Sequence, residues 1–419
     1  MRPPPRLASA LGPLALSAGL LLINPSTAHA AALPGPGFPA RYTAPYIETW
    51  RAGSSLTEAR TATGLQYFTL AFVISDGTCN GAFDGTVPVT DQGWEVALNQ
   101  LRAGGGDAIG SFGGGAGSEL AEVCDSVDSL KAAYRRVIDT LNLTVLDFDV
   151  EGDALGNSTA IDRRDRALAD LQREYAAAGR ALTVHYTLPA NPDGLGQQSL
   201  RLLRNAKDRG LVVSLVNIMT MDYGPDLNMG RVATEAADGL HDQMAQIWPE
   251  KSAAELWEMQ GNTPMIGVND ATNEVFSTED AGTLANFAND KGIQLLSFWA
   301  VGRDRPCAVE GTLSGTCSGT RQQPGEFSHL LSRPQSRGRP RPRPAPEPQS
   351  PRCLGPLGSP LSPSCAERPT NGDPAGAPRA GGGAVWASPA VWAGGTVRAG
   401  SCASGWEEPA LWCDGRAAR

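Results

Sequence analysis

Near the middle of the chain, residues 143–152 place three carboxylates in strict alternation with apolar side chains. The alternating positions are Leu146, Asp147, Phe148, Asp149, Val150 and Glu151. In a β-strand, whose side chains alternate between two faces, the three carboxylates point to one side and the apolar residues to the other. Like charges about 6 to 7 Å apart along a strand repel each other, so at least one acid should keep its proton to unusually high pH.

Strand-like and helix-like patterns alternate along most of the chain. Apolar or alternating runs predict strands at 42–50, 65–75, 108–114, 143–152, 181–189, 212–223, 264–268 and 293–301. Helical spacing of three and four separates several of them, for example at Val127, Leu130 and Tyr134. Eight such units within about 290 residues indicate a (β/α)8 TIM barrel. A doubly wound sheet is the alternative, disfavoured because no Gly-x-Gly-x-x-Gly opens a helix after the first strand.

The 419 residues exceed what one core usually holds, so the barrel needs only part of them. Residues 1–30, with an apolar run at 7–23 before Ala28-His29-Ala30, are typical of a secretory signal peptide. Residues 31–41 are expected to be a loose segment and 42–331 to be the barrel. No later apolar run approaches the roughly 20 residues that span a bilayer, so we expect a secreted, extracellular protein without membrane contact. We also expect a monomer.

Beyond residue 331 the periodicity vanishes. Residues 332–380, rich in Pro, Arg and Gly, are expected to form a disordered linker. Residues 381–419 resemble a small carbohydrate-binding module through Trp386, Trp392, Trp406 and Trp412 with Cys402 and Cys413, and are expected to be a disordered remnant of one. The Arg-Pro repeat at 337–344 would also arise from a Pro-Thr repeat read one base late. The remnant is therefore either degenerate or frame-shifted.

Charge and cysteine content narrow the partners. The tail carries 11 Arg against six acidic residues, so the residues before it carry 24 basic against 38 acidic side chains, and this acidic body disfavours nucleic acid. In an exported chain the eight cysteines should be oxidised. The preferred pairs are Cys79 with Cys124 and Cys307 with Cys317, each of which would staple loops. With four histidines and no CxxC or HExxH, neither a metal nor another cofactor is expected.

In a barrel the carboxyl ends of the strands converge on one cleft. The residues expected there, besides the three acids, are Ser111, Gly113, Gly114, Tyr186, Met219, Met221, Asp222, Tyr223 and Trp299.

Several of these runs resemble glycoside hydrolase family 18, the chitinases and their relatives. Asp-x-Asp-x-Glu at 147–151 resembles the family's signature strand, and Ser111-Phe112-Gly113-Gly114 resembles its third-strand Ser-x-Gly-Gly. Met219-Thr220-Met221-Asp222 resembles the sixth-strand Met-x-Tyr-Asp, and Trp299 the tryptophan that floors the sugar subsite. The resemblance covers roughly residues 42–331.

The resemblance implies substrate-assisted hydrolysis with retention. Glu151 would protonate the glycosidic oxygen, Asp149 would orient the substrate's acetamido group, and Asp147 would share a proton with Asp149. Asp222 and Tyr223 would bind acetamido and hydroxyl groups, and Trp299 and Trp50 would stack on sugar rings.

The sequence departs from the family pattern at two positions. Thr144 stands where the signature's first aspartate is expected, which removes a charge that would shape the titration of Asp147. Met221 stands where the sixth-strand tyrosine is expected and cannot donate a hydrogen bond. Because Tyr223 lies two residues further on the same strand face, we expect it to take that role.

Three functions remain open from the sequence. The first is an endo-acting chitinase that cleaves β-1,4-linked N-acetylglucosamine polymers, and the second is an endo-β-N-acetylglucosaminidase acting on N-glycans. The third is a non-catalytic chitin-binding lectin, which the presence of Glu151 disfavours.

Overall fold

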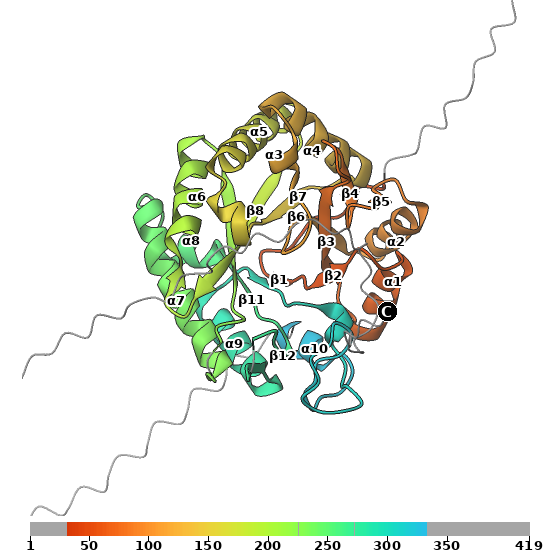
Figure 1. Cartoon of the computed structure of the whole chain (residues 1–419), viewed down its shortest axis with the longest axis vertical. Coiled ribbons are helices and arrows are strands. Elements are labelled where there is room, and N and C mark those ends of the chain that lie inside the picture. The colour runs from red at the N-terminus through yellow and green to blue at the C-terminus, as the bar shows by residue number, and fades with distance from the viewer. Residues whose placement is uncertain (1–31, 225, 272, 333–419) are drawn as a thin grey trace, which may run out of the picture. The chain divides into compact units, whose positions relative to one another are not determined.

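The computed structural model describes residues 32–332 except 225 and 272 (Figure 1). The expected signal peptide, the linker beyond Ser332 and the carbohydrate-binding remnant therefore lie outside the described residues. In the described part, no helix has the length and apolar character needed to cross a membrane.

Eight parallel strand positions close into a barrel ringed by helices (Figure 1). The first position is split between β1 and β2, which pair with the last strand and with β3, at Tyr42↔Leu295 and Tyr46↔Thr69. This closure confirms the predicted (β/α)8 fold. The barrel strands are β1 (Tyr42–Thr43), β2 (Tyr46–Glu48), β3 (Tyr67–Ser75), β6 (Asp107–Gly113), β7 (Val145–Asp149), β8 (Thr183–Asn191), β10 (Val213–Met219), β11 (Gln260–Thr263) and β14 (Leu295–Leu296).

The helices bury one apolar side against the outside of the barrel. The helix that leads into β7 begins at a capping box on Ser126 and ends at Asn142, whose φ is 50°. The helices are α1 (Ser54–Thr63), α2 (Gln92–Ala103), α3 (Leu120–Val123), α4 (Val127–Leu141), α5 (Ser158–Ala177), α6 (Gln197–Asp208), α7 (Met229–Ile247), α8 (Ala253–Glu258), α9 (Thr278–Lys291) and α10 (Glu326–Ser332), with 3-10 turns η1 (Gly152–Gly156) and η2 (Val301–Arg303).

The predicted seventh strand was placed too late in the chain. The barrel strand is β11, whose polar sequence hid it, because its side chains are satisfied by hydrogen bonds rather than by apolar packing. Asn262 donates to the Ala233 carbonyl of α7 and accepts from Thr220. Part of the expected strand instead forms the antiparallel ribbon of β12 (Gly267–Val268) and β13 (Val275–Phe276). Short excursions from the barrel are β4 (Gly81–Phe83), β5 (Val87–Pro88) and β9 (Gly194–Leu195).

The segment before β1 is less loose than expected, although it contains no helix or strand. The Ala32 N–H donates to the Thr140 carbonyl at 3.0 Å. The Leu33 N–H donates to Asn99, and the Leu33 carbonyl accepts from Arg102 at 2.7 Å. These contacts fix the segment across the amino-terminal end of the barrel.

The alternation predicted for β7 is confirmed. Phe148 faces outward and packs against Phe112 and Tyr134, with ring centroids 5.1 and 5.3 Å away. Asp147 and Asp149 face the barrel interior and are 3% and 5% exposed. Apolar packing against the helices therefore holds in place a strand whose other face carries buried acids.

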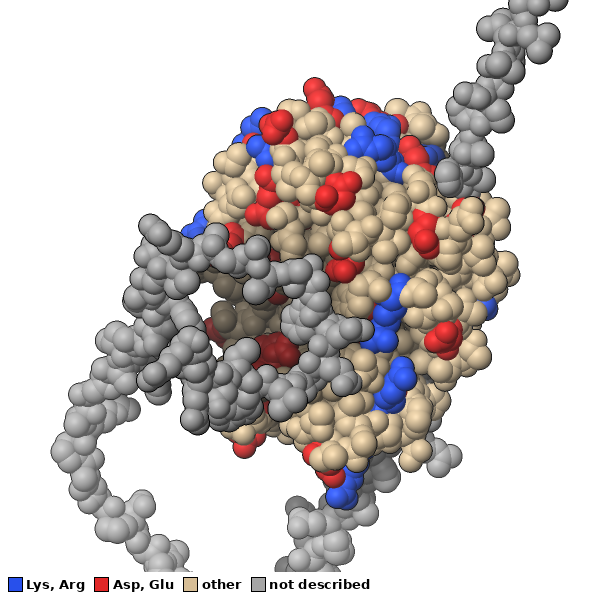
Figure 2. Space-filling view, turned by 45° about the vertical axis from the view of Figure 1, so that its right-hand side comes forward, with Lys and Arg blue, Asp and Glu red and all other residues tan. Residues whose placement is uncertain are grey.

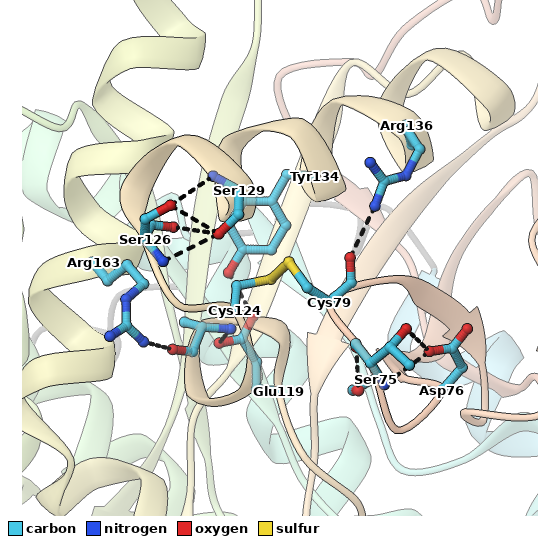
Figure 3. The surroundings of a disulfide bond; sticks show 12 residues. Ser75, Asp76, Cys79, Glu119, Cys124, Ser126, Ser129, Tyr134, Arg136 and Arg163 are labelled. Atoms are coloured by element: carbon cyan, nitrogen blue, oxygen red, sulfur yellow. Dashed lines mark hydrogen bonds between the residues drawn. A yellow bond between two sulfur atoms is a disulfide. The ribbon is translucent and has the colours of Figure 1, made fainter.

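Both predicted disulfides are confirmed. Cys79, in the loop between β3 and β4, pairs with Cys124 at the end of α3 (Figure 3). The Cys79 carbonyl accepts from Arg136 of α4 at 2.9 Å, which ties the same loop to a second helix. Cys307 pairs with Cys317 within one loop.

The two disulfides should differ in their contribution to stability. Cys79–Cys124 closes a separation of 45 residues and Cys307–Cys317 one of 10. Loop-closure entropy then predicts losses of about 4 and about 3 kcal/mol in the free energy of unfolding when each pair is replaced by serines. Denaturant unfolding of both double variants measures this, and a larger loss for the 307/317 pair would contradict the prediction.

Candidate active site

The three acids of the signature strand lie in line at the carboxyl end of β7. Asp147 and Asp149 belong to the strand, and Glu151 follows it in extended conformation and is half-buried. Figure 2 shows acidic side chains inside the hollow of the face in view, whereas the Lys and Arg side chains in view lie on the surface around it.

Asp147 is the most fully hydrogen-bonded of the three acids. Ser111 donates to its Oδ2 at 2.6 Å, Tyr46 to the same oxygen at 3.2 Å, and Thr187 to its Oδ1 at 2.7 Å. Burial raises the pKa of Asp147 to about 6, while the three hydroxyl donors act in the opposite direction by stabilising the carboxylate.

The hydrogen bonds around Asp147 continue across the barrel. Asn217 of β10 donates to the hydroxyls of Thr187 and Thr263 at 3.0 and 2.7 Å. Ser111 was expected at the site from its sequence motif, whereas Tyr46, Thr187, Asn217 and Thr263 were not. We use the name polar layer for a set of residues whose side chains connect six strands: Tyr46, Ser111, Asp147, Thr187, Asn217 and Thr263.

Asp149 has the opposite environment. Its Oδ1 is buried and has no hydrogen-bond partner among the described residues. Burial, followed by the negative charges of Glu151 and Asp147, holds the pKa of Asp149 well above its usual range. Asp149 therefore keeps its proton to higher pH than an exposed aspartic acid does.

The glycines after β6 allow that strand to approach β7 closely. The Gly114 N–H donates to the Asp149 carbonyl at 3.0 Å. A Cβ on Gly113, whose φ is 103°, would lie 2.1 Å from that carbonyl oxygen. A Cβ on Gly114 would lie 2.6 Å from the Phe72 ring. The two glycines thus let β6 approach a neighbouring backbone and an aromatic ring.

Glu151 borders a cavity of about 380 Å³ between the ends of β7, β8 and β10. The predicted residues Met219, Met221, Asp222 and Tyr223 also line it; the others are Pro189, Ala190, Asn191, Pro192 and Leu227. The Tyr223 hydroxyl is buried and has no hydrogen-bond partner among the described residues. Tyr223 thus lines the cavity with a hydroxyl donor that the described residues leave unused.

The pKa of Glu151 depends on its surroundings. Burial raises its pKa, and the carboxylate of Asp222 adds to the increase. Asp222 itself is exposed, has a φ of 57° and accepts a hydrogen bond from the Ala271 N–H at 2.9 Å. An acid with a raised pKa at the edge of a cavity is suited to donating a proton to a ligand.

The predicted tryptophans lie beside this line of acids. Trp299 stacks on Phe72 with centroids 5.8 Å apart and lies 5.9 Å from Tyr46, the hydroxyl partner of Asp147. Trp50 is 50% exposed and its ring centre lies 6.3 Å from that of Trp299. The two indoles extend an aromatic surface outward from the polar layer.

Tyr186 was wrongly expected at the site. It lies on the helix-facing side of β8, is 0% exposed and donates its hydroxyl hydrogen bond to Asp165. Arg164 lies 5.9 Å from the centre of its ring. Because side chains alternate along the strand, its neighbour Thr187 faces the barrel interior instead.

Thr144 has less bearing on the titration of Asp147 than its place in the motif suggested. It is half-buried just before β7, on the helix-facing side with Leu146 and Phe148. A charge at this position would therefore not lie on the face of the strand that carries Asp147. Within the described ranges, no cluster of three or more His, Cys, Asp or Glu side chains could hold a metal ion.

Comparisons with known proteins agree on one family. The catalytic domain of a hyperthermophilic chitinase from Pyrococcus furiosus is 35% identical, with 70% of this chain and 95% of that domain covered at a TM-score of 0.63. Site mutants of a domain of the thermostable P. furiosus chitinase, solved with chito-oligosaccharides, are 34% identical, with 70% and 94% covered at the same score.

Two curated proteins are each 34% identical, a probable bifunctional chitinase/lysozyme of Escherichia coli K12 over 286 residues and endochitinase 11 of Metarhizium anisopliae over 290. The alignments take in 65% and 66% of this chain but only 32% and 55% of those proteins. No family model matches the chain. The identity over nearly the whole Pyrococcus domain, on the same barrel, shows that the chain belongs to glycoside hydrolase family 18.

Proposed function

We propose that this protein is an endo-acting chitinase that hydrolyses β-1,4-linked N-acetylglucosamine polymers with retention. The observation that carries the proposal is the gradation along β7, from the hydrogen-bonded Asp147, through Asp149 with one unpartnered oxygen, to Glu151 at the cavity. The relatives named as chitinases support the substrate. Export of the mature chain is part of the proposal and rests on the signal-like segment 1–30.

In the proposed mechanism Glu151 gives its proton to the glycosidic oxygen as the bond to the leaving sugar breaks. The acetamido carbonyl oxygen of the substrate attacks the anomeric carbon and forms a cyclic oxazolinium ion. Asp149 orients the acetamido group through its unpartnered oxygen and stabilises the positive charge. The Glu151 carboxylate then takes a proton from a water molecule, which opens the ring from the opposite face.

The three functions considered for this family differ in the substrate that the protein cleaves or binds. Hydrolysis of a short chitin oligomer, with the β-anomer as the first product by NMR, is expected of this mechanism. Cleavage of a high-mannose glycopeptide alone would indicate an endo-β-N-acetylglucosaminidase, and binding without cleavage would indicate a lectin. Initial appearance of the α-anomer would exclude retention.

Glu151→Gln should lower kcat/KM on the chitin oligomer by about 10² to 10⁴-fold, since the amide cannot donate the required proton. Oligomer affinity, measured by calorimetry, should be retained because the side chain keeps its shape. Glu258→Gln on exposed α8 is the matched control and should match the unmodified protein. Turnover near normal in Glu151→Gln would refute the assignment.

Asp149→Asn should inactivate the enzyme yet stabilise the fold at neutral pH. Burial raises the folded-state pKa of Asp149 above the usual 3.8, so its proton is bound more tightly in the folded state. The stability this contributes is complete below the unfolded pKa and is lost as pH rises toward the folded pKa. Over that window the variant's advantage should grow by up to about 1.4 kcal/mol per pH unit. Denaturant unfolding at pH 4 and pH 7 measures it, and an unchanged difference would contradict the prediction.

Tyr223→Phe should reduce kcat/KM by about 10- to 100-fold, the value of a hydrogen bond to a group that gains charge. Met221→Leu, which lines the same cavity but removes no donor, should change it by less than about threefold, as expected for a volume-conserving change. Equal, small effects from both changes would show that another residue supplies the donor to the acetamido group.

A further inference from the structure

We propose that Glu274 is a positioning residue, whose buried carboxylate fixes the turn that carries Asp222 and Tyr223 beside Glu151. The Asp222 N–H donates to its Oε1 at 2.6 Å, and the Gly224 N–H to its Oε2 at 3.1 Å. The inference rests on the proposed function, because it assigns how two residues of that site are held.

Glu274 belongs to the loop between β12 and β13, far from β7 in sequence. Its side chain is 1% exposed. The Glu274 carbonyl accepts from the Asn269 N–H at 2.9 Å, and the Asn269 side chain donates to the Met265 and Gly267 carbonyls. The carboxylate is therefore anchored on a loop that is itself held by hydrogen bonds.

A buried carboxylate usually has a cationic partner, and Glu274 forms no salt bridge within the described residues. Its partners are backbone N–H groups on either side of Tyr223. Asp222 and Gly224 have φ of 57° and 92°, and the left-handed region is costly for a residue with a Cβ. Two charge-assisted hydrogen bonds offset that cost and hold the turn in one conformation.

The turn governs two groups that the proposed chemistry uses. It orients the Tyr223 hydroxyl, which is buried without a partner, and the Asp222 carboxylate, which contributes to the raised pKa of Glu151. The same loop holds that carboxylate through the Ala271 N–H. A turn released from Glu274 would leave both groups free to move relative to Glu151.

The charges around these groups give the direction of a pH effect. Glu151 faces Asp149 at the end of β7 and Asp222 of the turn. Asp222 in turn faces Asp270, Glu274 and Arg303. If the Asp222 carboxylate moves away from Glu151, the pKa of Glu151 falls, and the activity that needs its proton is lost at lower pH.

Glu274→Gln in the full chain is the test, because the amide oxygen replaces one acceptor and the NH2 group opposes the second N–H. We expect kcat on the chitin oligomer to fall about 10- to 100-fold per folded molecule, as misplacement of catalytic groups typically costs. The alkaline limb of the rate profile should also move to lower pH, which a loss of folded protein would not cause.

Asp304→Asn is the matched control. Asp304 is a buried carboxylate that accepts from the Phe327 and Ser328 N–H groups at 3.1 and 2.8 Å and holds α10. It should lower the melting temperature without changing kcat or the pH limb. Equal kinetic effects in both variants, or normal kinetics in Glu274→Gln, would overturn the inference.

Hydrogen exchange of the unmodified protein keeps the inference testable if Glu274→Gln does not fold. The Asp222 and Gly224 amides should be protected although they lie in an exposed turn, and rapid exchange there would overturn the assignment. Different results would contradict the proposed function and the role of Glu274. An unmodified protein that does not cleave the oligomer contradicts the proposed function, whereas normal cleavage with unprotected amides contradicts only the role of Glu274.

Discussion

The desolvation of three carboxyl groups along one strand is the constraint on which the rest of this structure depends. β7 places Asp147 and Asp149 inside the barrel, where water cannot solvate their charges, and continues to Glu151 at the edge of a cavity. Burial raises the pKa of all three acids. Hydrogen bonds from the polar layer oppose this increase in pKa only at Asp147. Asp149 and Glu151, which lie nearer the cavity, have no such donors among the described residues, so they keep their protons to higher pH than exposed acids do.

Other parts of the fold offset the free-energy cost of burying these acids. Phe112, Tyr134 and Phe148 pack on the opposite face of the sheet and keep the strand in register, while Gly113 lets β6 approach the Asp149 carbonyl. A disulfide ties the loop after β3 to the end of α3 (Figure 3). Apolar packing on the helix-facing side of the sheet thus stabilises the fold, whereas burial of the acids on the interior side destabilises it. This is expected where a site is built for chemistry rather than for folding.

The loops at the mouth supply what the strand alone cannot. A strand can line up acids, but it cannot place a hydroxyl donor and an additional charge opposite the last of them. Here the turn after β10 does so with Tyr223 and Asp222, and the loop between β12 and β13 holds that turn through Glu274 and Ala271. Precision at the proposed site therefore depends on a contact between two loops about 50 residues apart.

The sequence by itself determined the barrel, the two faces of β7 and both disulfides, because each leaves a local signal in periodicity, spacing or residue type. Only the tertiary structure decided which face of β8 is interior, so Tyr186 was chosen where Thr187 belongs. It also decided the position of β11, whose polar residues satisfy one another across elements, and the partners of Asp147 and Asp222. Periodicity relates a residue to its neighbours in one element. Hydrogen-bond partners such as Tyr46, Asn217 and Glu274 come from other elements, and only closure of the barrel brings them into contact.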